Sequence, residues 1–132
     1  MRLGSRTADS ERDVARILVA EDDAAVSAFV SRALKHKGHD VTAVPDGSAA
    51  LAALAGAPFE LLLTDIVMPN LDGIALALKA SKDHPRMRIL LMTGYANERQ
   101  RAHNLEALIH RVVEKPFTLE QICSAVDEEL GR

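Results

Sequence analysis

Short apolar runs alternate with amphipathic segments along most of the chain. Five runs of neighbouring apolar residues are typical of strands that are buried on both faces. They cover residues 17–20, 41–44, 61–65, 88–92 and 112–113. After each run, apolar residues recur at helical spacing or alanines accumulate, which predicts a helix. These helices run between residues 23 and 38, 46 and 55, 73 and 84, 97 and 104, and 118 and 130.

A strand followed by a helix, five times over, predicts an α/β fold. The expected architecture is a (βα)5 doubly wound five-stranded parallel sheet, with right-handed crossovers and helices on both faces. Asp23, Asp46 and Thr118 are placed to cap helices, and Gly38 to end one. In such sheets ligands bind beyond the carboxyl ends of the strands. The residues that directly follow the predicted strands are therefore the candidates for chemistry.

Acidic side chains follow the first and third predicted strands. Glu21, Asp22 and Asp23 come after the first strand, and Asp65 ends the third. Each alone has an ordinary explanation, since acidic residues are common at helix starts and in turns. Their coincidence at one sheet edge favours a divalent cation, and oxygen ligands without His or Cys favour Mg²⁺. Thr93 and Lys115 end the fourth and fifth strands and offer partners for anionic oxygens. The pattern predicts phosphoryl transfer onto Asp65.

Composition narrows the classes of protein that remain. The chain has 132 residues with a formal net charge of -3, which gives no electrostatic reason to expect binding to nucleic acid or to an anionic membrane. One cysteine precludes an internal disulfide, and no apolar run is long enough to cross a bilayer or to form a secretory signal. We therefore expect a cytoplasmic protein with a mobile tail over 1–14 and a single domain over 15–132.

Four segments together resemble the receiver domain of response regulators in two-component signalling. They span most of residues 16–130, and as a set they are highly specific. The segments are ILVAEDD at 17–23, LLTDIVMP at 62–69 with Asp72-Gly73, LMTG at 91–94, and EKPF at 114–117. The resemblance implies a flavodoxin-like topology with strand order 2-1-3-4-5. The third and fourth strand segments particularly resemble small stand-alone receivers of the CpdR type, known as adaptors for regulated proteolysis.

The resemblance assigns the acidic residues to the phosphorylation site. It implies that Asp65 is the phosphoacceptor and that Asp22 is a direct Mg²⁺ ligand. Glu21 would act through water, and the backbone carbonyl of Val67 would complete the metal contacts of the protein. Glu21 stands where Asp is commoner in the family, and because its charge is the same, metal binding should survive.

The other side of the site is also assigned by the resemblance. Thr93 would bond the phosphoryl group and move with it, Lys115 would pair with it, and the Lys115-Pro116 bond would be cis. Family members usually carry Tyr or Phe as a switching ring where this chain has Val112. Tyr95 is the substitute, either as that switch or as a cap over the pocket. With Val67 it would restrict the attacking water, which predicts slow acyl-phosphate hydrolysis that accelerates in Tyr95→Ala.

The implied function is a phosphorylation switch rather than an enzyme acting on other molecules. A sensor histidine kinase or histidine phosphotransferase would donate the phosphoryl group, and Asp65 would only take it up and lose it by hydrolysis. No output domain is expected, so a downstream protein would bind the face formed by the helix at 97–104, the strand at 112–113 and the last helix. The helix at 97–104 is poor in apolar residues. It is either a switching surface or a plain solvated helix.

Two other classes of function stay open at this point. A metal-dependent phosphohydrolase of similar topology needs an aspartate two residues after the nucleophile, and Val67 at that position counts against it. A binding module that never uses phosphate is the third possibility. Among the remaining residues, the five histidines are predicted to be solvated, and Cys123 is predicted to lie on the buried face of the last helix with Leu119, Ile122, Val126 and Leu130.

Overall fold

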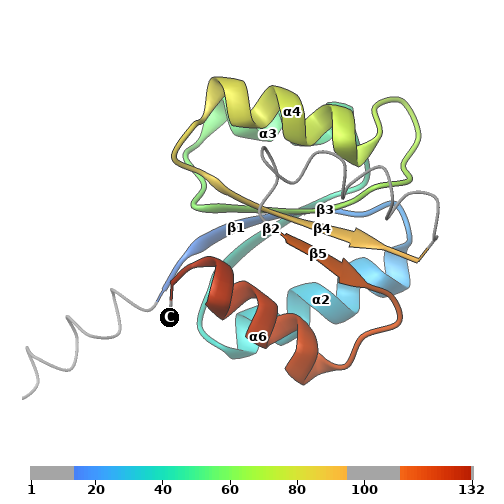
Figure 1. Ribbon diagram of the computed structural model, residues 1–132, viewed down its shortest axis with the longest axis vertical. Coiled ribbons are helices and arrows are strands. Elements are labelled where there is room, and N and C mark those ends of the chain that lie inside the picture. Colours follow the sequence, from blue (N-terminus) through green and yellow to red (C-terminus); the bar gives the residue numbers. More distant parts are fainter. Residues whose placement is uncertain (1–13, 95–110, 132) are drawn as a thin grey trace, which may run out of the picture.

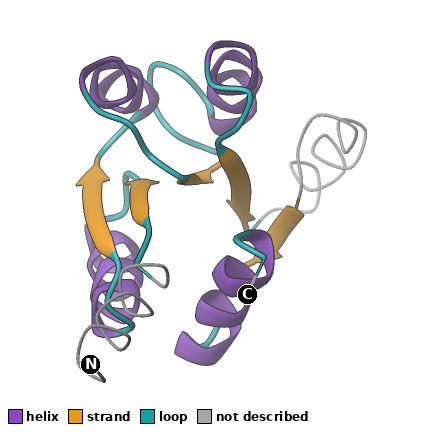
Figure 2. Ribbon diagram, turned by 90° about the vertical axis from the view of Figure 1, so that its left-hand side faces the viewer, coloured by secondary structure: helices purple, strands orange, loops and turns teal. Residues whose placement is uncertain are grey.

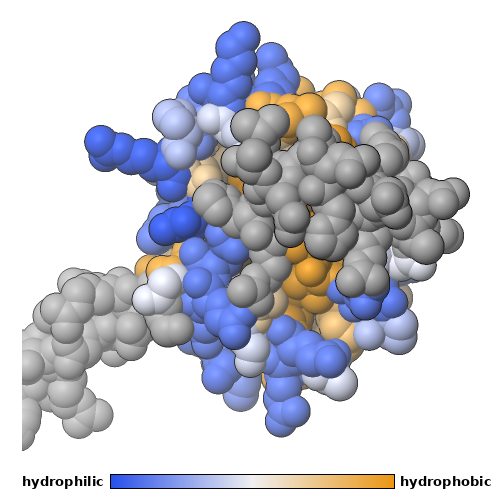
Figure 3. Space-filling model, in the orientation of Figure 1, coloured by the Kyte–Doolittle hydropathy of each residue, from blue (hydrophilic) through white to orange (hydrophobic). Residues whose placement is uncertain are grey.

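The structure is a computed structural model that describes residues 14–94 and 111–131 (Figure 1). The tail predicted to be mobile, Tyr95 and the helix predicted at 97–104 lie outside the described residues, apart from Val14 at the end of that tail. None of the described helices is both long and apolar enough to cross a membrane. In the view of Figure 3, hydrophilic side chains cover much of the described surface, with apolar ones between them.

Five parallel strands form one sheet, and its order confirms the expected topology. The strands are β1 (Arg16–Ala20), β2 (Asp40–Val44), β3 (Leu61–Asp65), β4 (Arg88–Thr93) and β5 (Arg111–Glu114). They lie in the order β2-β1-β3-β4-β5, and every neighbouring pair is parallel. All five strands start and end within one residue of the predicted apolar runs. All five side chains of β3 are buried, which explains its nearly continuous apolar sequence.

The described helices begin at the residues that the sequence suggested. They are α2 (Ala24–His36), α3 (Gly47–Gly56), α4 (Gly73–Asp83) and α6 (Leu119–Glu129). Asp23 accepts hydrogen bonds from the backbone N–H groups of Ala25 and Val26, and Asp46 caps α3 by accepting from the N–H of Ala49. Thr118 and Gln121 form a reciprocal capping box at the start of α6.

Two pairs of helices cover the two faces of the sheet (Figures 1 and 2). Helices α3 and α4 pack on one face over Leu18, Leu62 and Leu91, while α2 and α6 pack on the other over Val19, Leu63 and Leu90. Successive residues of a strand point to opposite faces, so each strand contributes to both cores. This sandwich holds the carboxyl ends of the strands in fixed relative positions.

Two expectations about individual side chains are wrong. His39 is buried rather than solvated, with 7% of its surface exposed, because its Nδ1 accepts a hydrogen bond of 3.1 Å from the backbone N–H of Ala15. Leu119 is 44% exposed although its spacing placed it on the buried face of the last helix. It is the first residue of α6, where the helix has not yet reached the core. Cys123 is buried as expected, and burial raises the pKa of its thiol.

Candidate functional site

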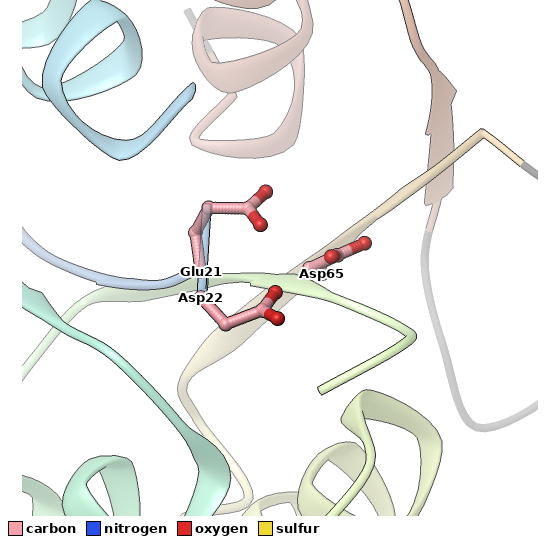
Figure 4. Close-up of side chains that lie close together, drawn as sticks. All are labelled: Glu21, Asp22 and Asp65. Atoms are coloured by element: carbon pink, nitrogen blue, oxygen red, sulfur yellow. The ribbon is translucent and has the colours of Figure 1, made fainter. Parts of the chain in front are cut away.

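Three carboxylates from two strand ends meet at the carboxyl edge of the sheet. Glu21 and Asp22 follow β1, and Asp65 ends the neighbouring strand β3. One carboxylate oxygen of each lies within 4.8 Å of the others, and the three groups project to the same side (Figure 4). The sequence placed these acids at one edge of the sheet because each comes at the carboxyl end of a parallel strand. The geometry confirms that they form one cluster.

The acidic cluster lies in an open hollow of about 550 Å³. Glu21 and Asp65 are buried, with 2% and 6% of their surfaces exposed, whereas Asp22 is exposed. The hollow is lined by Glu21, Asp22, Asp23, Val26, Asp65, Val67, Gly94, Lys115 and Pro116. Bringing buried carboxylates this close is costly unless positive charge is supplied.

Lys115 supplies positive charge from the end of β5. Its Nζ donates a hydrogen bond of 2.8 Å to Glu21 Oε1 and lies 3.3 Å from Asp65 Oδ2. Its backbone N–H donates to the carbonyl of Thr93 at 2.8 Å, which fixes the end of β5 against the end of β4. The Lys115-Pro116 peptide bond is cis, as the resemblance implied. The lysine therefore connects the two buried acids.

Burial and charge displace two pKa values in the site. Burial raises the pKa of Glu21, and it outweighs the hydrogen bonds from Lys115 and from the backbone N–H of Asp23 that favour the carboxylate. Burial alone would lower the pKa of Lys115, but the hydrogen bond to Glu21 and the charge of Asp65 prevail and raise it. Lys115 is thus held in its charged form.

Local hydrogen bonds orient the acids within the cluster. Asp65 Oδ1 accepts from the backbone N–H of Ile66 at 2.9 Å, and the same N–H donates to the carbonyl of Met92 at 3.1 Å. Glu21 Oε2 accepts from the N–H of Asp23 at 3.1 Å. Because Asp65 Oδ2 faces Lys115, both oxygens of the predicted phosphoacceptor are held.

The remaining predicted residues fall into two groups. Thr93 is buried at the end of β4, and Val67 and Pro116 line the hollow, Val67 with 44% of its surface exposed. Val112 lies apart from the hollow: it is half-buried, pairs in register with Leu91 and packs against the core beneath α3 and α4. Tyr95, its expected substitute, is outside the described residues. The described part of the chain thus places no switching ring at the site.

Sequence reasoning missed two kinds of neighbour. Val26 and Gly94 also line the hollow, but an apolar helix residue and a turn glycine carry no signal of their own. Thr64 was treated only as part of a strand, yet its buried hydroxyl bonds the backbone carbonyl of Asp65 at 2.9 Å. A hydroxyl in an otherwise apolar buried strand, next to the key acid, was the available signal.

The fold and the site together define the class of protein. The chain belongs to the response regulator receiver domain family, whose sequence model matches residues 17–127. It is a receiver domain of the kind found in two-component response regulators. No described residue contradicts the membership, and the strand order and strand-end acids agree with it.

Known relatives support this assignment and differ in length. The chain is 38% identical over 115 residues to the response regulator receiver protein CpdR of Brucella abortus, an alignment that covers 87% of this chain and 96% of that protein. It is 30% identical to the transcriptional regulatory protein TcrA of Mycobacterium tuberculosis, covering 81% of this chain but 42% of TcrA. A CheY-like receiver structure from Methanospirillum hungatei JF-1 superposes with a TM-score of 0.82 at 29% identity, covering 89% and 94% of the two chains.

Proposed function

We propose that this protein receives a phosphoryl group on Asp65 from a sensor histidine kinase or histidine phosphotransferase and then changes its affinity for a partner protein. The observation that carries the proposal is the cluster of Glu21, Asp22 and Asp65 within 4.8 Å, with Lys115 bridging two of them. A receiver needs this combination, since a carboxylate must act as the nucleophile while neighbouring positive charge neutralises the incoming phosphoryl oxygens.

The donor set fits Mg²⁺. Carboxylate and carbonyl oxygens are hard ligands, and Mg²⁺ binds through one or two carboxylates while it keeps several waters. Asp22 and Asp65 would bind directly, Glu21 would bind through water, and the backbone carbonyl of Val67 would add a further oxygen. Three carboxylates against one lysine leave two negative charges, which a divalent cation balances. When bound, the ion would neutralise charge on the transferred group.

Three residues of the chain would have separate roles in the transfer of the phosphoryl group. An oxygen of the Asp65 carboxylate attacks the phosphorus of a phosphohistidine, a P–O bond forms, and the P–N bond breaks, with its electron pair leaving on the imidazole. Lys115 lies on the Asp65 side of the hollow, where its ammonium group would pair with a phosphoryl oxygen. The Thr93 hydroxyl, at the end of the adjacent strand β4, would bond another.

The signal would leave through a protein surface. We assign this role to the face that comprises β5, α6 and the segment at 97–104, which lies outside the described residues. Along the described part of this face, a hollow of about 390 Å³ between β5 and α6 is lined by Val112, Val113, Glu114, Pro116, Phe117, Gln121 and Ala125. Pro116 also lines the phosphorylation site, so the two surfaces are continuous. We place this signalling in the cytoplasm.

The test is phosphorylation by a small donor. Acetyl phosphate with Mg²⁺ should give a stoichiometric, hydroxylamine-sensitive adduct in intact-mass measurements, and Asp65→Asn or removal of Mg²⁺ with EDTA should abolish it. Sustained phosphate release without an adduct would instead indicate a phosphohydrolase, although apolar Val67 occupies the place of its general acid. Wild-type behaviour of Asp65→Ala in cells would indicate a phosphate-independent binding module.

A further inference from the structure

We propose that Thr64 is a positioning residue for the phosphoacceptor, acting through the backbone of Asp65. The proposal rests on the proposed function of Asp65 and adds a residue that sets its geometry. Thr64 is fully buried in β3, in register with Ala20 of β1 and Leu91 of β4. Both neighbours are apolar and belong to the core beneath α3 and α4. A hydroxyl in such surroundings is costly unless it is hydrogen-bonded.

The hydroxyl of Thr64 makes its hydrogen bond to the phosphoacceptor's own backbone. It donates to the carbonyl oxygen of Asp65 at 2.9 Å, and its second contact is the sulfur of Met68 at 3.9 Å. The registered pairs between β1 and β3 end at Ala20 and Thr64, so Asp65 extends beyond that ladder. The threonine therefore supplies a contact at the point where strand pairing on the β1 side stops.

The same carbonyl is also confined by the start of α4. A side-chain carbon at Gly73 would lie 2.0 Å from the Asp65 carbonyl oxygen, so only a glycine fits where α4 begins. The N–H of the same peptide group, which belongs to Ile66, donates to the carbonyl of Met92 at 3.1 Å. The next peptide group is held as well, because the carbonyl of Ile66 accepts from the N–H of Gly73 at 2.8 Å. We call these contacts together the backbone clamp of Asp65, and the Thr64 hydroxyl is the side-chain group that takes part in it.

The clamp fixes the position of two groups that are important for phosphorylation. The first group is the Asp65 carboxylate, whose Oδ1 accepts a hydrogen bond from the backbone N–H of Ile66. The second is the carbonyl of Val67, the proposed metal contact, because Thr64 touches both Asp65 and Met68 on either side of it. Small displacements of a nucleophile or a ligand weaken attack and binding even where the fold is intact. Loss of the hydroxyl should therefore impair the site without unfolding the domain.

The experiment compares Thr64→Val, which keeps the shape and removes the hydroxyl, with Thr64→Ser, which keeps the hydroxyl and removes a methyl group. We expect Thr64→Val to lower the initial phosphorylation rate with acetyl phosphate and the affinity for Mg²⁺ by roughly three- to tenfold each, the worth of about one net hydrogen bond. Thr64→Ser should stay near the wild-type values. Thr42→Val, on the exposed strand β2, is the control for loss of a distant hydroxyl.

A purely structural role predicts a different ranking, because Thr64→Ser opens a methyl-sized gap and would be at least as harmful as Thr64→Val. That ranking, or wild-type rate and affinity in Thr64→Val, overturns the inference. If Thr64→Val does not fold, Thr64→Ser and Thr64→Ala repeat the comparison with only the hydroxyl differing. If the wild type takes no phosphoryl group, the proposed function fails, and the Mg²⁺ affinities, followed by amide chemical shifts, still decide the role of Thr64.

Discussion

Asp22 is the exposed member of an acidic cluster whose other two members are buried. Its carboxylate oxygen lies within 4.8 Å of oxygens of Glu21 and Asp65, so without a cation the three groups repel one another. We expect Asp22→Asn to raise the melting temperature in EDTA by roughly 2–4 °C. Bound Mg²⁺ stabilises the folded state by an amount that increases with its affinity. The rise in melting temperature that Mg²⁺ causes in the wild type should therefore shrink in Asp22→Asn, and an unchanged rise would exclude Asp22 as a ligand.

Lys115 should make the stability of the domain decrease at high pH. Burial acts against its charged form, but Glu21 and Asp65 prevail, so the pKa of Lys115 is raised above its ordinary value of 10.5. Its stabilising contribution is complete below that value and is lost as the pH rises through the raised pKa of the folded state. In urea titrations with EDTA from about pH 9 to about pH 12, the free energy of unfolding should fall more steeply for the wild type than for Lys115→Met. Parallel curves would contradict this prediction.

At the scale of residues, the sequence predicted those members of the candidate site whose position follows from lying at the end of a parallel strand. Glu21, Asp22, Asp65 and Lys115 all stand at strand ends, and parallel strands bring their ends together. Thr64 escaped notice because its role depends on the hydrogen bond that its hydroxyl makes. His39 was misjudged for a similar reason: its burial depends on a partner 24 residues away, the backbone N–H of Ala15.

At the scale of elements, the start of α4 is packed directly against the end of β3. A side-chain carbon at position 73 would lie 2.0 Å from the carbonyl oxygen of Asp65. This oxygen belongs to the backbone, which cannot move aside as the end of a flexible side chain could. We expect Gly73→Ala to destabilise the domain by about 1–3 kcal/mol or more and to slow phosphorylation of Asp65, because any relief of the clash displaces the nucleophile.

The matched control for this substitution is Gly56→Ala. Gly56 ends α3, and nothing lies within 4 Å of the position that its side chain would occupy. Alanine favours the helix there by up to about 1 kcal/mol. Urea unfolding should therefore shift in opposite directions for the two variants, and only Gly73→Ala should alter the phosphorylation rate. Equal effects would mean that the contact with Asp65 is not what requires glycine at 73.

The elements were predictable because periodicity and capping agree along this chain. Asp23, Asp46 and Thr118 cap the helices that the apolar spacing indicated. Periodicity describes a face, however, and does not say where along the helix that face meets the core. Leu119 lies on the apolar stripe of α6 but one turn before the first buried residue of the helix, Ile122.

At the scale of the whole molecule, one sheet is shared by two hydrophobic cores. Leu90 and Leu91 are neighbours on β4, both fully buried, yet Leu90 packs beneath α2 and α6 while Leu91 packs beneath α3 and α4. Because the central strands β1, β3 and β4 supply side chains to both cores, neither core can be lost while the sheet stays intact. The carboxyl edge that bears the site therefore depends on both.

Because the sheet is shared, a substitution that weakens the packing of either core should destabilise the entire domain. Leu90→Ala and Leu91→Ala should each lower the free energy of unfolding by about 2–5 kcal/mol. Each variant should unfold in urea in a single transition, observed equally by far-UV circular dichroism and by amide signals from both faces. The slope against urea should match the wild type, since the surface exposed on unfolding is the same. A second transition in one variant, confined to the helices of one face, would show that the two cores unfold separately and that the site depends on only one of them.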